Sequence, residues 1–303
     1  MTNNNSVLVV GATGNLGTEI CRQLVAAQKH VKGLARKTSD AGKIKTLKEL
    51  GVEIVIGDIK EPDTLKNAFD GVRAVISTTS STVSRSEGDN IESVDRAGQL
   101  NVVHAAKAAG VEQFIYISFL ASDESFPLQD AKREVEKAIA GSGMRYTILR
   151  PTFFMEVWLG PHLGFDPLNG KATIYGDGNN SVSWIAMKDV ASFAAASLDN
   201  AAADYNIIDL GGPEALSPRE VVKIFEERLE KNIELQLVPA TAIQMQMEGT
   251  DDPLQKSFAG LMLTYASGAR VPMDETLKKI PVKLTSIKDY CIRLTGAEMV
   301  GSE

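Results

Sequence analysis

Residues 6–36 read SVLVVGATGNLGTEICRQLVAAQKHVKGLAR, and this stretch predicts how the first half of the chain folds. The apolar, β-branched run at residues 7–10 is typical of a strand buried on both faces. A glycine-rich turn follows, then apolar residues at helical spacing, and residues 31–35 suit a second strand. The order of strand, turn, helix and strand predicts one βαβ unit.

Three glycines, Gly11, Gly14 and Gly17, stand between the first strand and the helix in a GxxGxxG spacing. The first permits a tight turn, the second lets the backbone approach a phosphate, and the third lets the helix lie close to the strand. Free N–H groups at the start of the helix attract a pyrophosphate. We therefore expect a bound dinucleotide, while a glycine-rich turn of another α/β fold is the alternative. The turn residues expected to bind it are Gly11, Thr13, Gly14, Asn15, Leu16 and Gly17.

Composition narrows the class of protein. The chain has 303 residues and a net charge of −7, and it has no basic stripe of the kind that binds nucleic acid. No apolar run approaches the ~18 residues that a membrane span needs. The polar start MTNNNS predicts no signal peptide, and neither the cysteines nor the histidines have metal-ligand spacing. We expect a cytoplasmic protein without a metal, a membrane span or a nucleic-acid partner.

Strands and helices alternate along the first half of the chain. Apolar runs that suit further strands occur at residues 52–56, 74–76, 113–118 and 146–149. This alternation predicts an α/β fold with a doubly wound parallel Rossmann sheet. Ligands bind such sheets at the carboxyl ends of the strands, where Thr78 and Thr79 lie. Residues 81–89 are polar and aperiodic and are predicted to form a surface loop, and a later helix is predicted over 131–140.

The character of the sequence changes at Pro151, where an aromatic segment rich in proline and glycine begins. We expect residues 1–150 to form the dinucleotide-binding Rossmann domain and residues 151–303 a smaller mixed α/β substrate lobe. Within that lobe, residues 186–200 should pack back on the first domain. A strand is predicted near 182–185. Since no flexible linker is present, the ligand cleft should lie between two parts that pack as one body.

The placed motifs resemble a known family. The segments VVGATGNLG, GDIKEPDTL, VDRAGQLNVVHAAKAAGV, FIYISFLAS and YTILRPTFF are similar to those of atypical short-chain dehydrogenase/reductases. Among these the chain most resembles the NmrA-like group, which includes isoflavone-type and triphenylmethane-dye reductases. The resemblance is close over residues 1–155 and loose over the last 60 residues. It implies NAD(P) binding and leaves the reaction open.

The end of the second strand bears on which dinucleotide is bound. NAD-specific Rossmann folds have an acidic residue about 20 positions past the glycine motif, on the ribose 2′-hydroxyl. Here Arg36 and Lys37 occupy that place, and the nearest acid is Asp40. A guanidinium can hold a 2′-phosphate through two parallel hydrogen bonds. We therefore expect NADP bound by Arg36 and Lys37, while a solvated charge before a helix is the alternative for Arg36.

The resemblance also implies an adenine site at Asp58 and Ile59. The carboxylate would accept a hydrogen bond from the exocyclic amine, and the apolar side chain would cover the ring. The alternative is that Asp58 serves the turn that follows Gly57.

The catalytic residues are less clear than the cofactor site. The resemblance implies a lysine, here Lys132, and a catalytic serine, here Ser118. Ordinary members of the superfamily carry a general-acid tyrosine four residues before the lysine, and this chain has Leu128 there. Lys132 is therefore interpreted as a ribose ligand and possible proton donor, or alternatively as a solvated lysine. Tyr116 alternates with apolar strand residues and is predicted to lie in the core.

The aromatic segment after residue 150 should form a wall of the cleft. Pro151 and Phe153 are expected beside the cofactor, and Phe154, Trp158 and His162 beside the substrate. Ordinary core packing is the alternative for each aromatic residue.

Two functions follow from these observations. The first is an NADPH-dependent reductase that transfers a hydride to a small conjugated or aromatic acceptor, such as a quinone or an enone. The second is a non-catalytic NADP-binding protein that senses redox state or assists assembly and contacts a protein partner. Leu128 at the tyrosine position favours the second. The oligomeric state, monomer or homodimer, stays open.

Overall fold

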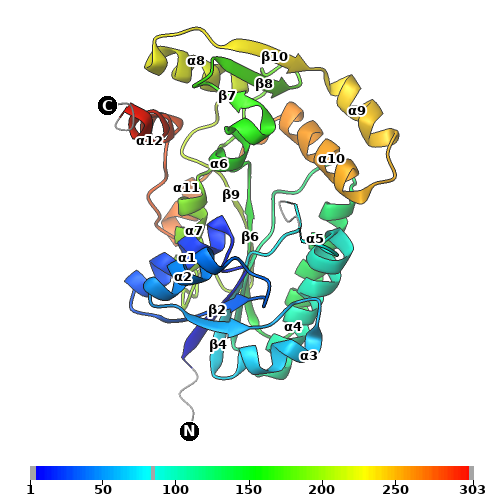
Figure 1. The fold of residues 1–303 in the computed structure, drawn as a ribbon, viewed down its shortest axis with the longest axis vertical. Coiled ribbons are helices and arrows are strands. Elements are labelled where there is room, and N and C mark those ends of the chain that lie inside the picture. The colour runs from blue at the N-terminus through cyan, green and yellow to red at the C-terminus, as the bar shows by residue number, and fades with distance from the viewer. Residues whose placement is uncertain (1–4, 83–85, 300–303) are drawn as a thin grey trace.

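The computed structural model describes residues 5–82 and 86–299, and its two sheets lie one above the other in Figure 1. The lower sheet has seven strands, each parallel to its neighbours, in the order β3-β2-β1-β4-β5-β6-β9. The strands are β1 (Ser6–Val10), β2 (His30–Ala35), β3 (Glu53–Ile56), β4 (Val72–Ser77), β5 (Gln113–Ile117), β6 (Arg145–Pro151) and β9 (Asn206–Leu210).

Helices cover both faces of this sheet, which confirms the predicted doubly wound α/β fold. Because successive side chains of a strand point to opposite faces, Val7 and Val9 pack with α1 and α7, whereas Leu8 and Val10 pack on the face of α4 and α5. The covering helices are α1 (Asn15–Ala26), α2 (Ala41–Glu49), α3 (Pro62–Leu65), α4 (Gln99–Ala108), α5 (Pro127–Ala140), α7 (Met187–Ala196) and α11 (Asp274–Lys279). A 3-10 helix, Lys66–Phe69, follows α3, and a π-helix, Ile91–Gly98, leads into α4.

The upper sheet is small and mixed. It has the order β10-β8-β7 and is formed by β7 (Phe165–Asp166), β8 (Lys171–Tyr175) and β10 (Glu234–Val238). Its helices are α6 (Met155–Trp158), α8 (Pro218–Leu229), α9 (Ala240–Glu248), α10 (Pro253–Ser267) and α12 (Ile287–Met299), with a 3-10 turn at Pro161–Leu163. Aromatic side chains, among them Phe165, Trp184 and Phe225, make up much of its core.

The late part of the chain returns to the first sheet. β9 pairs with β6, and α7 packs on α1, where Gln23 Nε2 donates to the carbonyl of Lys188 at 3.0 Å. Ser192 Oγ in turn donates to Gln23 Oε1 at 3.0 Å. The seven-stranded sheet therefore uses segments from both sides of Pro151. The division of the chain into two domains at this residue stays a prediction.

Two predicted elements differ from the structure. The strand expected at 182–185 is not part of a sheet, because its residues bridge singly to separate segments: Val182 to Leu216 and Ala269, and Ile185 to Phe154. The helix expected over 131–140 begins earlier, at Pro127. A proline fits the first helical position because its fixed φ suits the helix and the N–H it lacks would have no intrahelical partner.

The predicted surface loop at 81–89 is anchored at both of its ends. Ser81 is buried, and both its N–H and its hydroxyl donate to Asp95 Oδ2, at 2.9 and 2.6 Å. The side chain of Asp89 is only 3% exposed. Residues 83–85 lie outside the described residues. The side chains of Ser81 and Asp89 therefore anchor this segment to the protein, while residues 86–88 between them are exposed, as expected of a surface loop.

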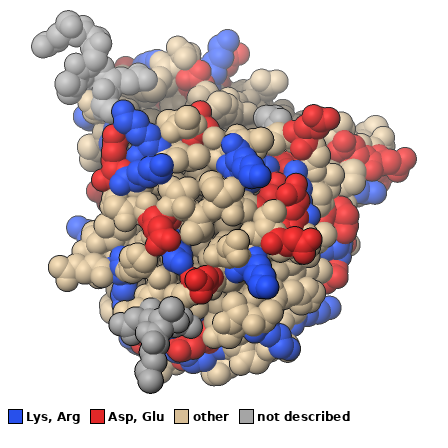
Figure 2. All heavy atoms as spheres, turned by 60° about the horizontal axis from the view of Figure 1, so that its bottom comes forward, with Lys and Arg blue, Asp and Glu red and all other residues tan. Residues whose placement is uncertain are grey.

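The surface carries charges of both signs. On the face seen in Figure 2, Lys and Arg side chains lie close to Asp and Glu side chains. None of the helices within residues 5–82 and 86–299 combines the length and the apolar character needed to cross a bilayer.

Candidate functional site: a dinucleotide-binding cleft

The glycine-rich turn has the tight geometry that its spacing predicts. Gly11 has φ +89°, and its carbonyl accepts a hydrogen bond from the N–H of Gly14 at 3.0 Å. A Cβ on Gly17 would lie 2.0 Å from the Gly11 oxygen, so only a glycine lets α1 approach the turn this closely. The N-terminus of α1, at Asn15, therefore opens directly at the carboxyl end of β1.

A buried hydroxyl beside this turn has no hydrogen-bond partner among the described residues. Within the described residues, Thr79 Oγ1 and Asp95 Oδ1 are the buried side-chain polar atoms that form no hydrogen bond. Thr79 Oγ1 lies 3.0 Å from where a Cβ on Gly11 would stand. A buried polar atom normally has a hydrogen-bond partner, so this hydroxyl points to a ligand in the turn. Neighbouring Thr78 is held in the sheet by its N–H, which donates to the carbonyl of Val10 at 2.9 Å.

The carboxyl end of β2 shows a contact that the sequence analysis missed. Arg36 Nη1 lies 3.0 and 2.8 Å from the two carboxylate oxygens of Asp89, and Lys60 Nζ lies 2.7 Å from Asp89 Oδ1. Asp40, the acid nearest in sequence, instead caps α2 by accepting from the N–H of Lys43 at 2.8 Å. Arg36 is therefore only partly solvated, because an acid 53 positions away pairs with it and one third of its side chain stays exposed.

The residues expected around adenine lie at the adjacent strand end. Asp58 Oδ1 accepts from the backbone N–H of Lys60 at 2.9 Å, which is the turn role considered for it. Ile59 is 7% exposed and packs against Gly98, where an added Cβ would come within 2.8 Å of it. Lys37 is exposed.

Lys132 lies in the interior on α5. It is 5% exposed, and its Nζ atom is 3.4 Å from Tyr116 Oη and 3.5 Å from the carbonyl of Ile117. Burial lowers the pKa of Lys132 below its ordinary value, while the carboxylates of Asp95 and Glu136 oppose that shift. The alternative of a solvated lysine is therefore wrong.

Leu128, at the place of the missing tyrosine, is packed between the two parts of the protein. It is 2% exposed and lies in an apolar cluster with Ile243 and Met247 of α9 and Leu263 of α10. Its N–H donates to Ser257 Oγ of α10 at 3.0 Å. A phenol at this position would enter an apolar contact rather than an open cleft.

Ser118 adjoins a buried ionic network that the sequence analysis did not identify. Its hydroxyl accepts a hydrogen bond from Arg133 Nη1 at 3.3 Å, and Arg133 also donates to the carbonyl of Phe119 at 2.6 Å. Glu136 pairs with both Arg133 and Arg150. Burial lowers the pKa of Arg133, and the facing carboxylate of Glu136 opposes this.

The aromatic residues expected to form a wall are largely core residues, as the alternative stated: Phe153 and Tyr265, the latter from α10, are buried, and Trp158 packs against them half-buried. The rings of Trp158 and Tyr265 are stacked at 5.2 Å, and Phe153 meets them edge-on at 4.7 and 5.7 Å. Burial raises the pKa of Tyr265. The other expected wall residues lie apart from this cluster: Phe154 packs with the core of the seven-stranded sheet, and His162 is exposed.

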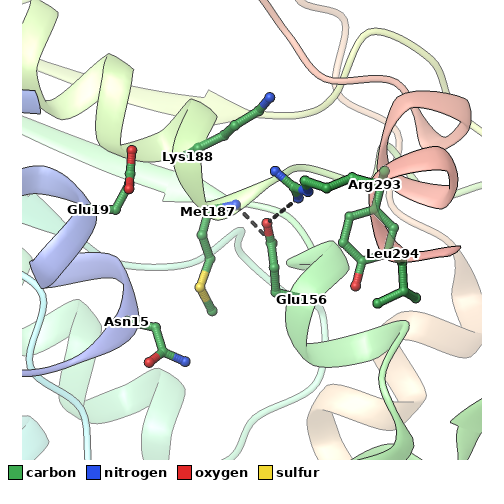
Figure 3. A pocket seen from close by; sticks show the side chains of 8 residues that line it. Asn15, Glu19, Glu156, Met187, Lys188, Arg293 and Leu294 are labelled. Carbon is green, nitrogen blue, oxygen red and sulfur yellow. Dashed lines mark hydrogen bonds and ion pairs between the residues drawn. The ribbon is translucent and has the colours of Figure 1, made fainter. Parts of the chain in front are cut away.

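A cavity of about 410 Å³ lies beside the N-terminus of α1 (Figure 3). Of the predicted site residues only Asn15 lines it, and its other lining residues include Lys188, Tyr290 and Arg293. The carboxylate of Glu156 also lines the cavity. It accepts a hydrogen bond from the N–H of Met187 at 2.9 Å and forms an ion pair with Arg293 at 3.3 Å. This cavity is separate from Lys132 and Ser118.

The seven-stranded parallel sheet, the glycine turn beneath a helix N-terminus and the unpartnered Thr79 hydroxyl define a dinucleotide-binding Rossmann protein. These features fit the pyrophosphate of a dinucleotide. The model of the NmrA-like family matches residues 3–291, and the chain belongs to that family.

Similar proteins differ in what their names describe. The chain is 31% identical to the photosystem II assembly factor Ycf39 of Synechocystis sp., over 78% of this chain and 72% of that protein. It is 33% identical to an NAD(P)H azoreductase of Xenophilus azovorans, over 71% of each. The solved structure of AtPrR2 with NADP+ and (+)pinoresinol is 26% identical, with a TM-score of 0.74, covering 95% of this chain and 97% of that one.

Proposed function

We propose that this protein is an NADPH-dependent reductase that passes a hydride to a small conjugated or aromatic acceptor. The observation that carries the proposal is the buried Lys132 of α5, whose Nζ atom lies at the carboxyl end of β5, on the same sheet edge as the glycine turn. A buried lysine whose pKa is lowered by its burial suits proton transfer near neutral pH. The azoreductase and the pinoresinol-bound AtPrR2 support a reductase with a flat, unsaturated substrate.

The glycine turn and the strand ends of the seven-stranded sheet hold the cofactor. The N–H groups at the start of α1 and the hydroxyl of Thr79 bind the pyrophosphate, and Arg36 binds the 2′-phosphate. Asp58 and Ile59 flank the adenine, and Lys132 holds the nicotinamide ribose. NADPH supplies the hydride when it is bound.

The other groups of the cleft orient the acceptor and supply its proton. Lys132 donates a proton to the oxygen or nitrogen atom of the acceptor and regains one from solvent. Trp158, which Phe153 and Tyr265 hold in place and which stays partly exposed, offers an aromatic surface to a planar molecule. Arg133 fixes the hydroxyl of Ser118 at the same strand end.

A second function is favoured by one specific observation. Leu128 stands in an apolar contact between the two parts of the protein, where ordinary relatives have the general acid. A non-catalytic NADP-binding protein that assists the assembly of a protein partner fits this residue and the similarity to Ycf39.

One experiment separates the two functions. The purified protein is mixed with NADPH and a panel of azo dyes, quinones and enones, and loss of NADPH absorbance is followed. A reductase oxidises NADPH with at least one acceptor, and Lys132→Ala lowers that rate by about 100-fold, as expected for loss of a general acid. Lys137→Ala, an exposed lysine of the same helix, is the matched control and retains activity. Tight NADPH binding without oxidation by any acceptor would favour the assembly function.

A further inference from the structure

The carboxyl ends of β2 and β3, where the proposed function places the adenosine of NADP, contact an anion that belongs to the protein itself. Both carboxylate oxygens of Asp89 lie within 3.0 Å of Arg36 Nη1, and Lys60 Nζ binds one of them at 2.7 Å. Ser86 Oγ accepts from Arg36 Nη2 at 3.2 Å on the same side. The carboxylate is almost completely buried, with 3% of the Asp89 side chain exposed.

The two cations come from the ends of different strands. Arg36 follows β2 and Lys60 follows β3, so their charges meet only because these strands are neighbours in the sheet. The side chains of Arg36 and Lys60 remain partly exposed, at 33% and 25%. Two cationic side chains that lie close together and are still partly accessible to solvent can bind a phosphate group.

Charge makes the two anions competitors. The 2′-phosphate of NADP carries close to two negative charges at neutral pH, and Asp89 carries one. The two positive charges of Arg36 and Lys60 can neutralise either the phosphate or the carboxylate. They cannot neutralise both at once, and the two anions would repel each other at close range. A phosphate has more charge and more acceptor oxygens than a carboxylate, so it can take the cations from Asp89.

We propose that Asp89 sets the cofactor preference of this protein by occupying the 2′-phosphate site, and that Lys60 joins Arg36 as a phosphate ligand when NADP displaces the carboxylate. This inference rests on the proposed NADP-binding function and deepens it. Binding of NADP exchanges one anion for another on the same cations, so its affinity is lower than two unoccupied cations would provide. NAD lacks the 2′-phosphate and leaves the Asp89 contact in place.

The test is the affinity of purified variants for NADP and NAD, measured by calorimetry without any substrate. Asp89→Asn removes the competing charge, and we expect the Kd for NADP to fall by about tenfold while the Kd for NAD stays within about twofold, consistent with the loss of one close charge interaction. Glu87→Gln removes the same charge from an exposed position two residues away and should leave both values unchanged.

A second variant decides the matter if Asp89→Asn does not fold. Lys60→Gln should raise the Kd for NADP about tenfold and leave that for NAD unchanged, because only the phosphate uses this ammonium group. The same variants can be titrated with 2′,5′-ADP and with 5′-AMP, which carry no nicotinamide. We expect both substitutions to change the Kd for 2′,5′-ADP as they change that for NADP, and to leave the Kd for 5′-AMP unchanged.

Several outcomes would overturn the inference. An unchanged or weaker NADP affinity in Asp89→Asn would show that the carboxylate does not compete. Weaker NAD binding in that variant would instead make Asp89 a ligand of the ribose hydroxyl. A wild-type protein that binds neither dinucleotide would refute the proposed function itself, which is distinguishable from all of these results.

Discussion

The Nζ atom of Lys132 lies 3.4 Å from the phenolic oxygen of Tyr116, and both side chains are buried. The ammonium also lies 5.2 Å from the centre of the tyrosine ring. In ordinary relatives the phenol beside this lysine comes from the same helix, four residues earlier. Here the helix supplies Leu128 at that place, and the phenol comes from β5. Lys132 therefore still has a phenol beside it, but this phenol comes from a strand of the sheet.

Removal of this phenol oxygen should change how the reaction depends on pH. In Tyr116→Phe the lysine loses a hydrogen-bond acceptor that favours its charged form, so the pKa of Lys132 should fall further. If the protonated lysine is the acid, the alkaline limb of the profile of kcat/KM moves to lower pH, and activity above that limb falls by about tenfold. An unaltered profile would contradict a role for Tyr116 in positioning the lysine.

Removal of the buried charge should stabilise the fold while it strongly lowers turnover. Lys132→Met replaces an ammonium in the interior with an apolar chain of similar length, and we expect about 1 kcal/mol of added stability, which raises Tm by roughly 2–4 °C. Thermal unfolding with and without NADPH measures this. A lower Tm without cofactor would show that the Lys132 contacts stabilise the folded state.

The size of that gain should depend on pH in a defined direction. The pKa of Lys132 is lower in the folded protein than its ordinary value of 10.5, so the unfolded chain binds more protons between the two values. The wild-type protein therefore gains stability as the pH rises through this window. The advantage of Lys132→Met should shrink over the same range, and an advantage that grows with pH would contradict this account.

Restoring the tyrosine of ordinary relatives should not restore their chemistry. Leu128→Tyr forces a larger, polar side chain into the apolar contact with α9 and α10, and we expect a loss of about 1–3 kcal/mol measured by chemical denaturation. Leu128→Met, which nearly conserves volume, is the control and should cost less than about 1.5 kcal/mol. A stable Leu128→Tyr protein with faster NADPH oxidation would refute this expectation.

A single added methyl group can test whether cofactor binding needs the close approach of α1 to the glycine turn. In Gly17→Ala the new methyl group would lie 2.0 Å from the Gly11 carbonyl oxygen, so the helix must move. We expect dinucleotide binding to be lost and stability to fall by roughly 1–3 kcal/mol or more. Gly296→Ala in α12, where nothing lies within 4 Å, should be neutral or stabilising. Full cofactor affinity in Gly17→Ala would show that the turn does not need this packing.

Local sequence patterns correctly predicted the elements that depend on interactions between residues close together in the chain. The βαβ unit at residues 6–35 follows from an apolar run, three glycines and helical spacing, all of which act within a few residues. The prediction of a strand at 182–185 was wrong. The apolar residues of this segment pack in a core as expected, but no single neighbouring strand pairs with them. A pattern of side chains indicates burial, while a sheet also needs a partner of matching register.

The sequence by itself determined the Rossmann sheet, the glycine turn and the positions of Arg36 and Lys132, because each depends on the order and chemistry of nearby residues. Only the tertiary structure decided what surrounds those two cations. Asp89 contacts Arg36 across 53 positions, and Tyr116 contacts Lys132 across 16, because the segment after β4 and helix α5 pack beside the carboxyl ends of β2 and β5. Side chains that are distant in the chain therefore meet at these strand ends, and such meetings have no local sequence signal.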